Sequence, residues 1–171
     1  TRIPWIFRNI ADDRQMAYTI AYHVYKELGF KRVAILRADN RYGRFGVGEF
    51  KASSVRLKRP APIEINYEIA YKNLNPDFEM QIDRLRGVKP EAVVLWADAA
   101  AAAHLLKRMR QVGLDMPGFA ADRIVHPNFL EIAGEAAEGV VAAFPYDPDA
   151  EIPELKRFKE EYRRRHNAEP T

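Results

Sequence analysis

The chain has 171 residues, of which 47% are hydrophobic and 30% are charged, as expected for one globular domain with a core of its own. It contains no cysteine, which excludes disulfides, thiolate zinc sites and cysteine nucleophiles, and no apolar run approaches the roughly 20 residues of a membrane span. The net charge of +3 is spread along the chain except for YRRRH at 162–166, and such a cluster on a terminal helix usually faces solvent. We therefore expect no nucleic-acid contact and no membrane insertion.

Short apolar runs alternate with longer amphipathic segments along the chain. Strands are expected at 4–8, 32–37, 63–70, 92–97, 118–121 and 139–145. Helices are expected at about 12–28, 43–58, 77–87, 99–113, 127–134 and 153–166. In the first helix, Asp12 stands where an N-cap would and Gly29 where the helix should stop.

Strands that alternate with helices predict parallel βαβ units and a three-layer, doubly wound α/β fold. The runs 33–36 and 92–96 are apolar throughout, as in strands covered by helices on both faces, whereas 63–70 alternates and is expected nearer an edge. The segment 144–154 holds three prolines and four acids and reads as a connector. We therefore divide the chain into a single ligand-binding α/β domain, 1–145, and a hinge segment with a terminal helix, 146–171.

Ligands of open α/β sheets meet the loops beyond the carboxyl ends of the strands. The polar residues of those loops are Arg8, Asp12, Asp39, Asn40, Tyr42, Asp98, Asp122, Arg123 and His126. A hydroxyl-bearing aromatic and several acids on one rim suit a small polar ligand that carries a cation, such as an amino acid. The alternative for Tyr42 is a turn residue that packs over the next helix, and for Asp98 and Asp122 it is a helix N-cap.

The glycine-rich stretch RYGRFGVGEF at 41–50 does not match a nucleotide-binding loop. Gly43, Gly46 and Gly48 make neither GxGxxG nor a loop ending in GK[ST]. The stretch instead predicts a tight turn into a helix, in which Gly46 and Gly48 allow close packing. No cofactor is implied.

The sequence gives little sign of a catalytic or metal-binding motif. The four histidines have no paired spacing, and Ser53 and Ser54 lie mid-helix without a nucleophile elbow. Asp39, Asp98 and Asp122 could hold Mg²⁺ in a phosphatase-like or receiver-like site, but the clustered acids and late lysine of a receiver are not evident. We therefore expect no metal and no enzyme activity, with an α/β enzyme of flavodoxin-like or hydrolase type kept as an alternative.

Five segments occur in the order of a known family: PWIFRNIADDRQ, LGFKRVAILRADNRYGR, the block from YEIAYKNL through KPEAVVLWADAAAAAHLLKRMRQVGL, FLEIAGEAAEGVVAAFPYDPD and FKEEYRRRHNAEPT. Together they resemble the second lobe of the type I periplasmic solute-binding proteins of ABC transporters, the leucine/isoleucine/valine-binding group. The resemblance covers nearly all of this chain but about half of a full family member. The chain also opens without a start methionine or signal pattern, so we expect it to be a piece of a longer protein.

The resemblance implies where a ligand would bind. Tyr42 would face it across an interlobe cleft, Ala97 or Asp98 would give a second contact, and Asp122 would take an α-ammonium group. Trp96-Ala97-Asp98 and Ala121-Asp122-Arg123 depart from the glycine-containing segments of the amino-acid binders. Arg123 or Arg8 could therefore face a carboxylate, as in aromatic acids or dicarboxylates.

The resemblance also implies a partner protein and a cellular location. It suggests a periplasmic or other extracytoplasmic protein that delivers a small molecule to a membrane permease by closing two lobes on a hinge. Since the groups that usually grip the α-carboxylate lie on the other lobe, the isolated chain would bind weakly. The ligand-sensing domain of a receptor or a transcriptional regulator has the same fold and is the alternative.

Overall fold

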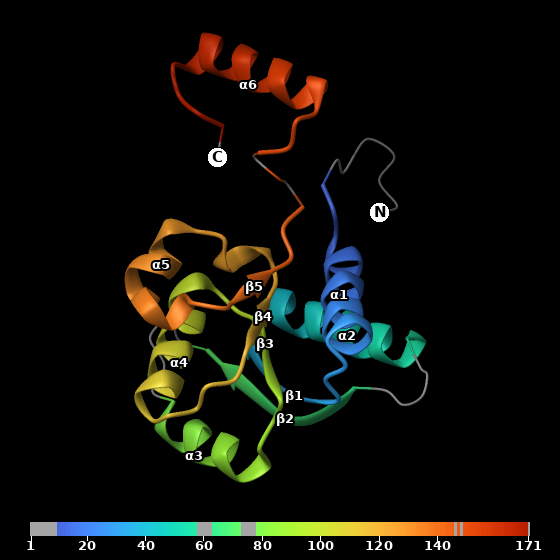
Figure 1. Ribbon diagram of the computed structural model, residues 1–171, viewed down its shortest axis with the longest axis vertical. Helices are drawn as coiled ribbons and strands as arrows, with labels where there is room; N and C mark the ends of the chain where they lie inside the picture. The colour runs from blue at the N-terminus through green and yellow to red at the C-terminus, as the bar shows by residue number, and fades with distance from the viewer. Residues whose placement is uncertain (1–9, 58–62, 73–77, 146, 148, 171) are drawn as a thin grey trace.

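The computed structural model describes residues 10–57, 63–72, 78–145, 147 and 149–170. Its centre is one parallel five-stranded sheet with strand order β2-β1-β3-β4-β5 (Figure 1). The strands are β1 (Arg32–Ala38), β2 (Glu64–Tyr71), β3 (Ala92–Trp96), β4 (Gly118–Ala120) and β5 (Val141–Ala142). The predicted parallel, doubly wound α/β fold is confirmed.

Helices connect the strands. They are α1 (Asp13–Tyr22) with its π-helical extension η1 (His23–Glu27), α2 (Arg41–Arg56), α3 (Glu79–Val88), α4 (Ala99–Gln111), the 3₁₀ turn η2 (Asp122–Ile124), α5 (Pro127–Ala133), the 3₁₀ turn η3 (Gly134–Ala137) and α6 (Pro153–His166). In the described ranges, no helix is both long and apolar enough to cross a membrane.

Two hydrophobic clusters cover the two faces of the sheet, because side chains alternate along each strand. On one face Ile35 and Trp96 pack with residues of α1 and α2, such as Phe50. On the other face Leu36 and Leu95 pack with residues of α3, α4 and α5. Figure 1 shows the same three layers, with α1 and α2 on one side and α3, α4 and α5 on the other.

Most predicted elements agree with the structure, and the differences lie at their ends. As predicted, β2 is an edge strand. The second helix begins at Arg41, two residues earlier than predicted, because Asn40 caps it. The strand predicted at 139–145 shortens to β5, and the one predicted at 4–8 lies outside the described residues.

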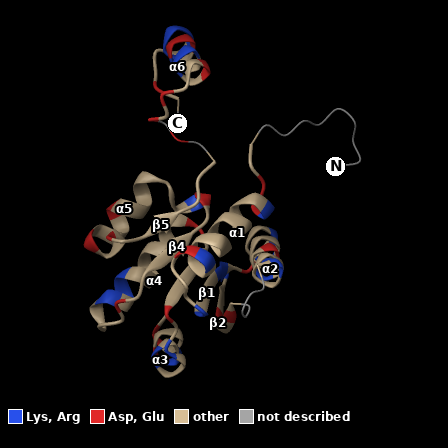
Figure 2. Ribbon diagram, turned by 45° about the vertical axis from the view of Figure 1, so that its right-hand side comes forward, with Lys and Arg blue, Asp and Glu red and all other residues tan. Residues whose placement is uncertain are grey.

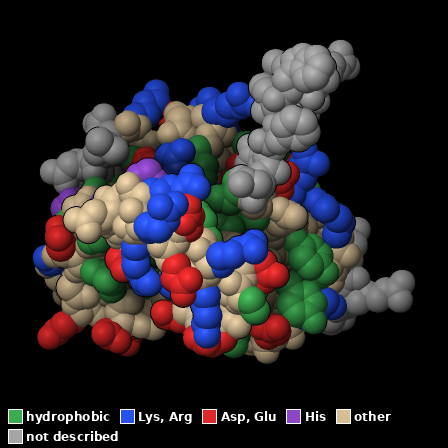
Figure 3. All heavy atoms as spheres, turned by 90° about the horizontal axis from the view of Figure 1, so that it is seen from above, with side chains coloured by type: hydrophobic (Ala, Val, Ile, Leu, Met, Phe, Trp, Pro, Cys, Tyr) green, Lys and Arg blue, Asp and Glu red, His purple; other side chains and the backbone are tan. Residues whose placement is uncertain are grey.

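The C-terminal helix α6 differs from the others because all its residues are at least partly exposed. Figure 1 shows it beyond the end of the sheet, and Figure 2 shows both signs of charge along it. Viewed from the side of α6, basic and acidic side chains lie interspersed (Figure 3). On this face, therefore, the excess basic charge does not form a separate patch.

Candidate functional site

The junction between β1 and α2 is a sharp turn that brings the helix close to the strand end. The Asn40 side chain accepts a hydrogen bond from the Gly43 amide at 3.0 Å and so caps α2. A Cβ on Gly43 would lie 2.0 Å from the Ala38 carbonyl oxygen, so only glycine fits there. A Cβ on Gly46 would lie 1.9 Å from the Trp96 ring, whereas one on Gly48 would meet nothing within 4 Å. The close packing predicted for Gly46 is confirmed. The prediction for Gly48 is wrong, since its position in α2 faces open space.

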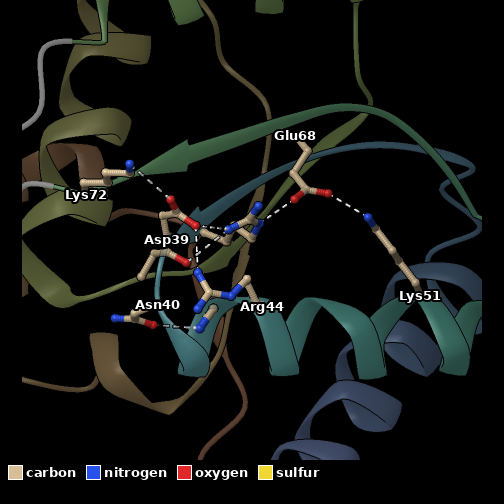
Figure 4. Close-up of polar contacts among 9 residues, drawn as sticks. Asp39, Asn40, Arg44, Lys51, Glu68 and Lys72 are labelled. Carbon is tan, nitrogen blue, oxygen red and sulfur yellow. Dashed lines mark hydrogen bonds and ion pairs between the residues drawn. The ribbon is translucent and has the colours of Figure 1, made fainter.

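An ion-pair network fixes this junction to the neighbouring strand (Figure 4). Arg37 binds Glu68 of β2 on one side and Asp39 on the other, the latter at 3.2 Å. Arg44 of α2 donates to Asp39 at 2.9 Å, and Lys51 donates to Glu68 at 2.7 Å. Asp39, a candidate from its place at a strand end, is therefore engaged in holding β1, β2 and α2 together.

The network makes a prediction about acid stability. Hydrogen bonds from Lys51 and Arg37 hold the pKa of Glu68 below its ordinary 4.5, although burial alone would raise it. A depressed folded-state pKa stabilises the fold above pH 4.5, and this stabilisation is lost as the pH falls through the lower folded-state value. Glu68→Gln should therefore flatten the curve of melting temperature against pH below pH 4.5.

The matched control is Glu64→Gln, which removes an exposed carboxylate from the same strand. It should leave the acid side of the curve close to that of the parent chain. Equal curves for Glu68→Gln and the parent would show that the network does not contribute to acid stability.

Four of the residues predicted as ligand contacts come together at the carboxyl edge of the sheet. Tyr42 lies in the first turn of α2, and its hydroxyl donates to Asp122 Oδ1 at 3.2 Å. The guanidinium carbon of Arg123 lies 3.7 Å from the centre of the Tyr42 ring. Arg123 Nη1 also donates to Asp98 Oδ1 at 2.7 Å. One chain of contacts thus joins Asp122, Tyr42, Arg123 and Asp98.

Tyr71, the last residue of β2, extends this chain of contacts and was missed by the sequence reasoning. Its hydroxyl donates to Asp98 Oδ2 at 3.0 Å and accepts from the Asp98 amide at 2.7 Å. Its position at a strand end of the same sheet was the available signal. Ala97 is only 1% exposed, so Asp98 is the residue of that pair whose side chain reaches the site. Arg8 lies outside the described residues.

The alternative interpretation of Asp98 and Asp122 was that each is the N-cap of a helix. Asp98 occupies the N-cap position of α4, but its side chain makes no capping bond and instead binds Arg123 and Tyr71. Asp122 is the first residue of the turn η2 and accepts from Tyr42. The N-cap interpretation is therefore correct in position for Asp98, although its side chain makes no capping hydrogen bond, and wrong for Asp122, because Ala121 is the N-cap residue of η2. It is correct for Asp12 and also describes His126, whose ring accepts from the Asn128 amide at 3.1 Å.

The charge states at the site follow from burial and neighbours. Burial raises the pKa of Tyr42, and the charge of Asp122 adds to the effect. Burial likewise raises the pKa of Tyr71. Burial would lower the pKa of Arg123, but the hydrogen bond to Asp98 together with the electrostatic interactions with Tyr42, Asp98 and Asp122 outweighs this and raises it. Both phenols therefore remain protonated donors at neutral pH, and Arg123 remains a cation.

Tyr42 and Arg123 border a hollow of about 810 Å³. Its other lining residues are Asp12, Asp13, Arg14, Arg41 and Phe45, from the first turns of α1 and α2. Two further hollows, of about 330 and 460 Å³, lie on either side of β5. They are lined mainly by apolar residues and do not include Tyr42 or Arg123. Among the described residues no three His, Asp or Glu side chains gather as a metal site requires. The polar hollow beside Tyr42 is therefore the candidate site.

Comparison with known proteins places this geometry in a family context. A family model described as "Periplasmic binding protein" matches residues 2–171. An amino acid binding protein of Pseudomonas aeruginosa is 26% identical over 160 residues, which are 92% of this chain and 41% of that protein. A leucine binding protein from Thermotoga maritima is 25% identical with a TM-score of 0.81, over 94% of this chain and 45% of that one. A putative branched-chain amino acid ABC transporter from Rhodospirillum rubrum is 26% identical with a TM-score of 0.80, over 98% and 47%. The chain thus spans less than half the length of these relatives.

Proposed function

Because this chain belongs to the periplasmic binding protein family, we propose that it is one lobe of a solute-binding component of an ABC transporter. The ligand would be an amino acid or a related small carboxylate, bound outside the cytoplasm and passed to a membrane permease. The observation that carries the proposal is that Tyr42 and Arg123 border one hollow and are held there by contacts with Asp122 and Asp98. A rigid sheet edge that presents an aromatic ring beside paired charges suits recognition of a small charged molecule.

The arrangement of α6 supports the proposed division of the chain. Residues 1–145 would form the lobe, and 146–171 the hinge segment and a helix that leads to the other lobe. The Phe158 side chain of α6 is half-exposed, and exposure of an aromatic ring to water is unfavourable unless a partner covers it. The Rhodospirillum rubrum relative is named a putative branched-chain amino acid ABC transporter, and this name supports the proposed kind of partner. The proposed chemistry is binding without turnover, as the family description implies.

The proposal is tested on the full two-lobe parent protein by a thermal-shift screen. The panel holds branched, polar and aromatic amino acids, aromatic acids, dicarboxylates, amides and sugars. A ligand at 100 times its Kd adds about 2.7 kcal/mol to the free energy of unfolding, which raises the melting temperature measurably. Sugars as the only ligands, or no ligand at all, would count against an amino-acid or carboxylate transporter.

Tyr42→Ala should lower the affinity for the ligand found by roughly 10- to 100-fold, because the ring provides one wall and holds Arg123 in place. Isothermal titration of the parent and variant proteins measures this change. Tyr42→Phe keeps the ring and removes only the hydroxyl that binds Asp122, so it should lose less than Tyr42→Ala. Equal affinities of the parent and Tyr42→Ala would place the binding site elsewhere.

A further inference from the structure

Arg123 occupies the place that a cationic ligand group would need. Its guanidinium covers the face of Tyr42 with its carbon 3.7 Å from the ring centre, and it binds Asp98 at 2.7 Å. The second oxygen of Asp98 already accepts from Tyr71 at 3.0 Å. An aromatic face and a carboxylate are the two groups that a protein normally offers to an ammonium group. Here both are engaged by the protein's own cation.

The same contacts hold Arg123 ready to bind an anion. Asp98 takes one of the five N–H donors of a guanidinium, and the Arg123 side chain remains 46% exposed beside the hollow. The contacts with Tyr42 and Asp98 fix its plane, so little side-chain entropy is lost when a carboxylate binds. Arg123 is therefore a preorganised donor at the rim of the hollow.

The surroundings of the hollow add positive potential. Arg14 and Arg41 also line it, from the first turns of α1 and α2. The first turn of α2 carries the positive end of the helix dipole, and its cap, Asn40, is neutral. On the acidic side, Asp12 and Asp13 also line the hollow, so three arginines face two carboxylates. Asp12 is engaged in capping α1 through the amides of Arg14 and Gln15.

We propose that the ligand presents a carboxylate to this lobe in place of an ammonium group, and that Arg123 is the residue that selects it. This inference rests on the proposed transport function and specifies the chemical class within it: monocarboxylates without an amino group, or dicarboxylates. The competing hypothesis is that Asp122 binds the ammonium group of an amino-acid ligand. In the structure Asp122 accepts from the Tyr42 hydroxyl at 3.2 Å, which orients the ring on which Arg123 stacks. Asp122 thus acts as a positioning residue.

The test uses the two-lobe parent and pairs of ligands that differ by one amino group: leucine against 4-methylpentanoate, phenylalanine against 3-phenylpropanoate, and glutamate against glutarate. Isothermal titration gives Kd for each. The member without the amino group should bind at least about 10-fold more tightly in the pair that binds best, because the amino group meets Arg123. Tighter binding of the amino acid in every pair would overturn the inference and leave the transport function standing. No binding by any pair would overturn this inference and count against the amino-acid or carboxylate proposal too.

Three variants and one control, Arg56→Gln, assign the effect to Arg123. Arg123→Gln should weaken carboxylate binding by roughly 10- to 100-fold, since it removes a charge-assisted hydrogen bond. Arg123→Lys keeps the charge and should lose less. Asp122→Asn should also lose less than Arg123→Gln, and the reverse order would support the ammonium reading and overturn ours. Arg56→Gln, at the exposed far end of α2, should bind like the parent. Melting temperatures of the ligand-free variants show whether each is folded.

Discussion

Trp96→Ala should lower the free energy of unfolding by about 3–5 kcal/mol, since it removes the largest fully buried side chain of the described residues. Trp96 ends β3, and its ring packs in the cluster between the sheet and helices α1 and α2. It also lies beneath the candidate site, with its ring 6.3 Å from that of Tyr42. Urea unfolding followed by circular dichroism measures the change.

Trp96→Phe is the matched control. The Trp96 indole nitrogen is buried and has no hydrogen-bond partner among the described residues, so phenylalanine keeps most of the packing and removes an unpaired donor. This variant should lose well under half of what Trp96→Ala loses. Equal losses would show that ring packing does not account for the stability at this position.

Gly46→Ala should lower the free energy of unfolding by about 1–3 kcal/mol, although alanine normally favours a helix. The added methyl carbon would lie 1.9 Å from the Trp96 ring nitrogen, so α2 must move away from the sheet or the ring must turn. Because Tyr42 lies on the same helix, the variant should also weaken ligand binding by the parent protein. Urea unfolding and isothermal titration measure the two effects.

Gly48→Ala is the control for the helix itself. Position 48 is exposed, and an added methyl would meet nothing within 4 Å, so alanine should stabilise the chain by about 0.4–1 kcal/mol. In a Trp96→Ala background, Gly46→Ala should lose much of its effect, because the ring that it contacts is gone. A Gly46→Ala variant as stable as Gly48→Ala would show that the helix adjusts freely.

The sheet could be predicted because each strand is marked by its own short run of apolar residues. Val93, Val94 and Leu95 are apolar without interruption, which only a strand covered on both faces explains in an alternating α/β chain. The start of α2 was predicted two residues late, since Asn40 was taken as a loop residue and not as the N-cap. The need for glycine at position 43 depends on how closely Ala38 approaches, and that distance is set by the packed fold.

The candidate site was predictable as a set of positions, since Tyr42, Asp98 and Asp122 all lie at the carboxyl ends of parallel strands or just beyond. Its internal contacts were not. Arg123 could have paired with Asp122 beside it, and only side-chain geometry directs it to Asp98 and the ring of Tyr42. Tyr71 lies one residue beyond the predicted strand 63–70 and was not among the candidates, because its hydroxyl finds Asp98 only after β2 and β3 are assembled.

The order of the strands also affects how the chain can fold. β1 lies inside the sheet, yet both of its neighbours come later in the sequence: Ile35 pairs with Glu68 and with Val94. During synthesis, β1 therefore leaves the ribosome with both backbone edges unpaired and with apolar side chains on both faces. Pairings between distant residues form slowly, and unpaired apolar strands aggregate. Until Ala92–Trp96 has been made, β1 therefore lacks one of its two neighbours and stays open to aggregation.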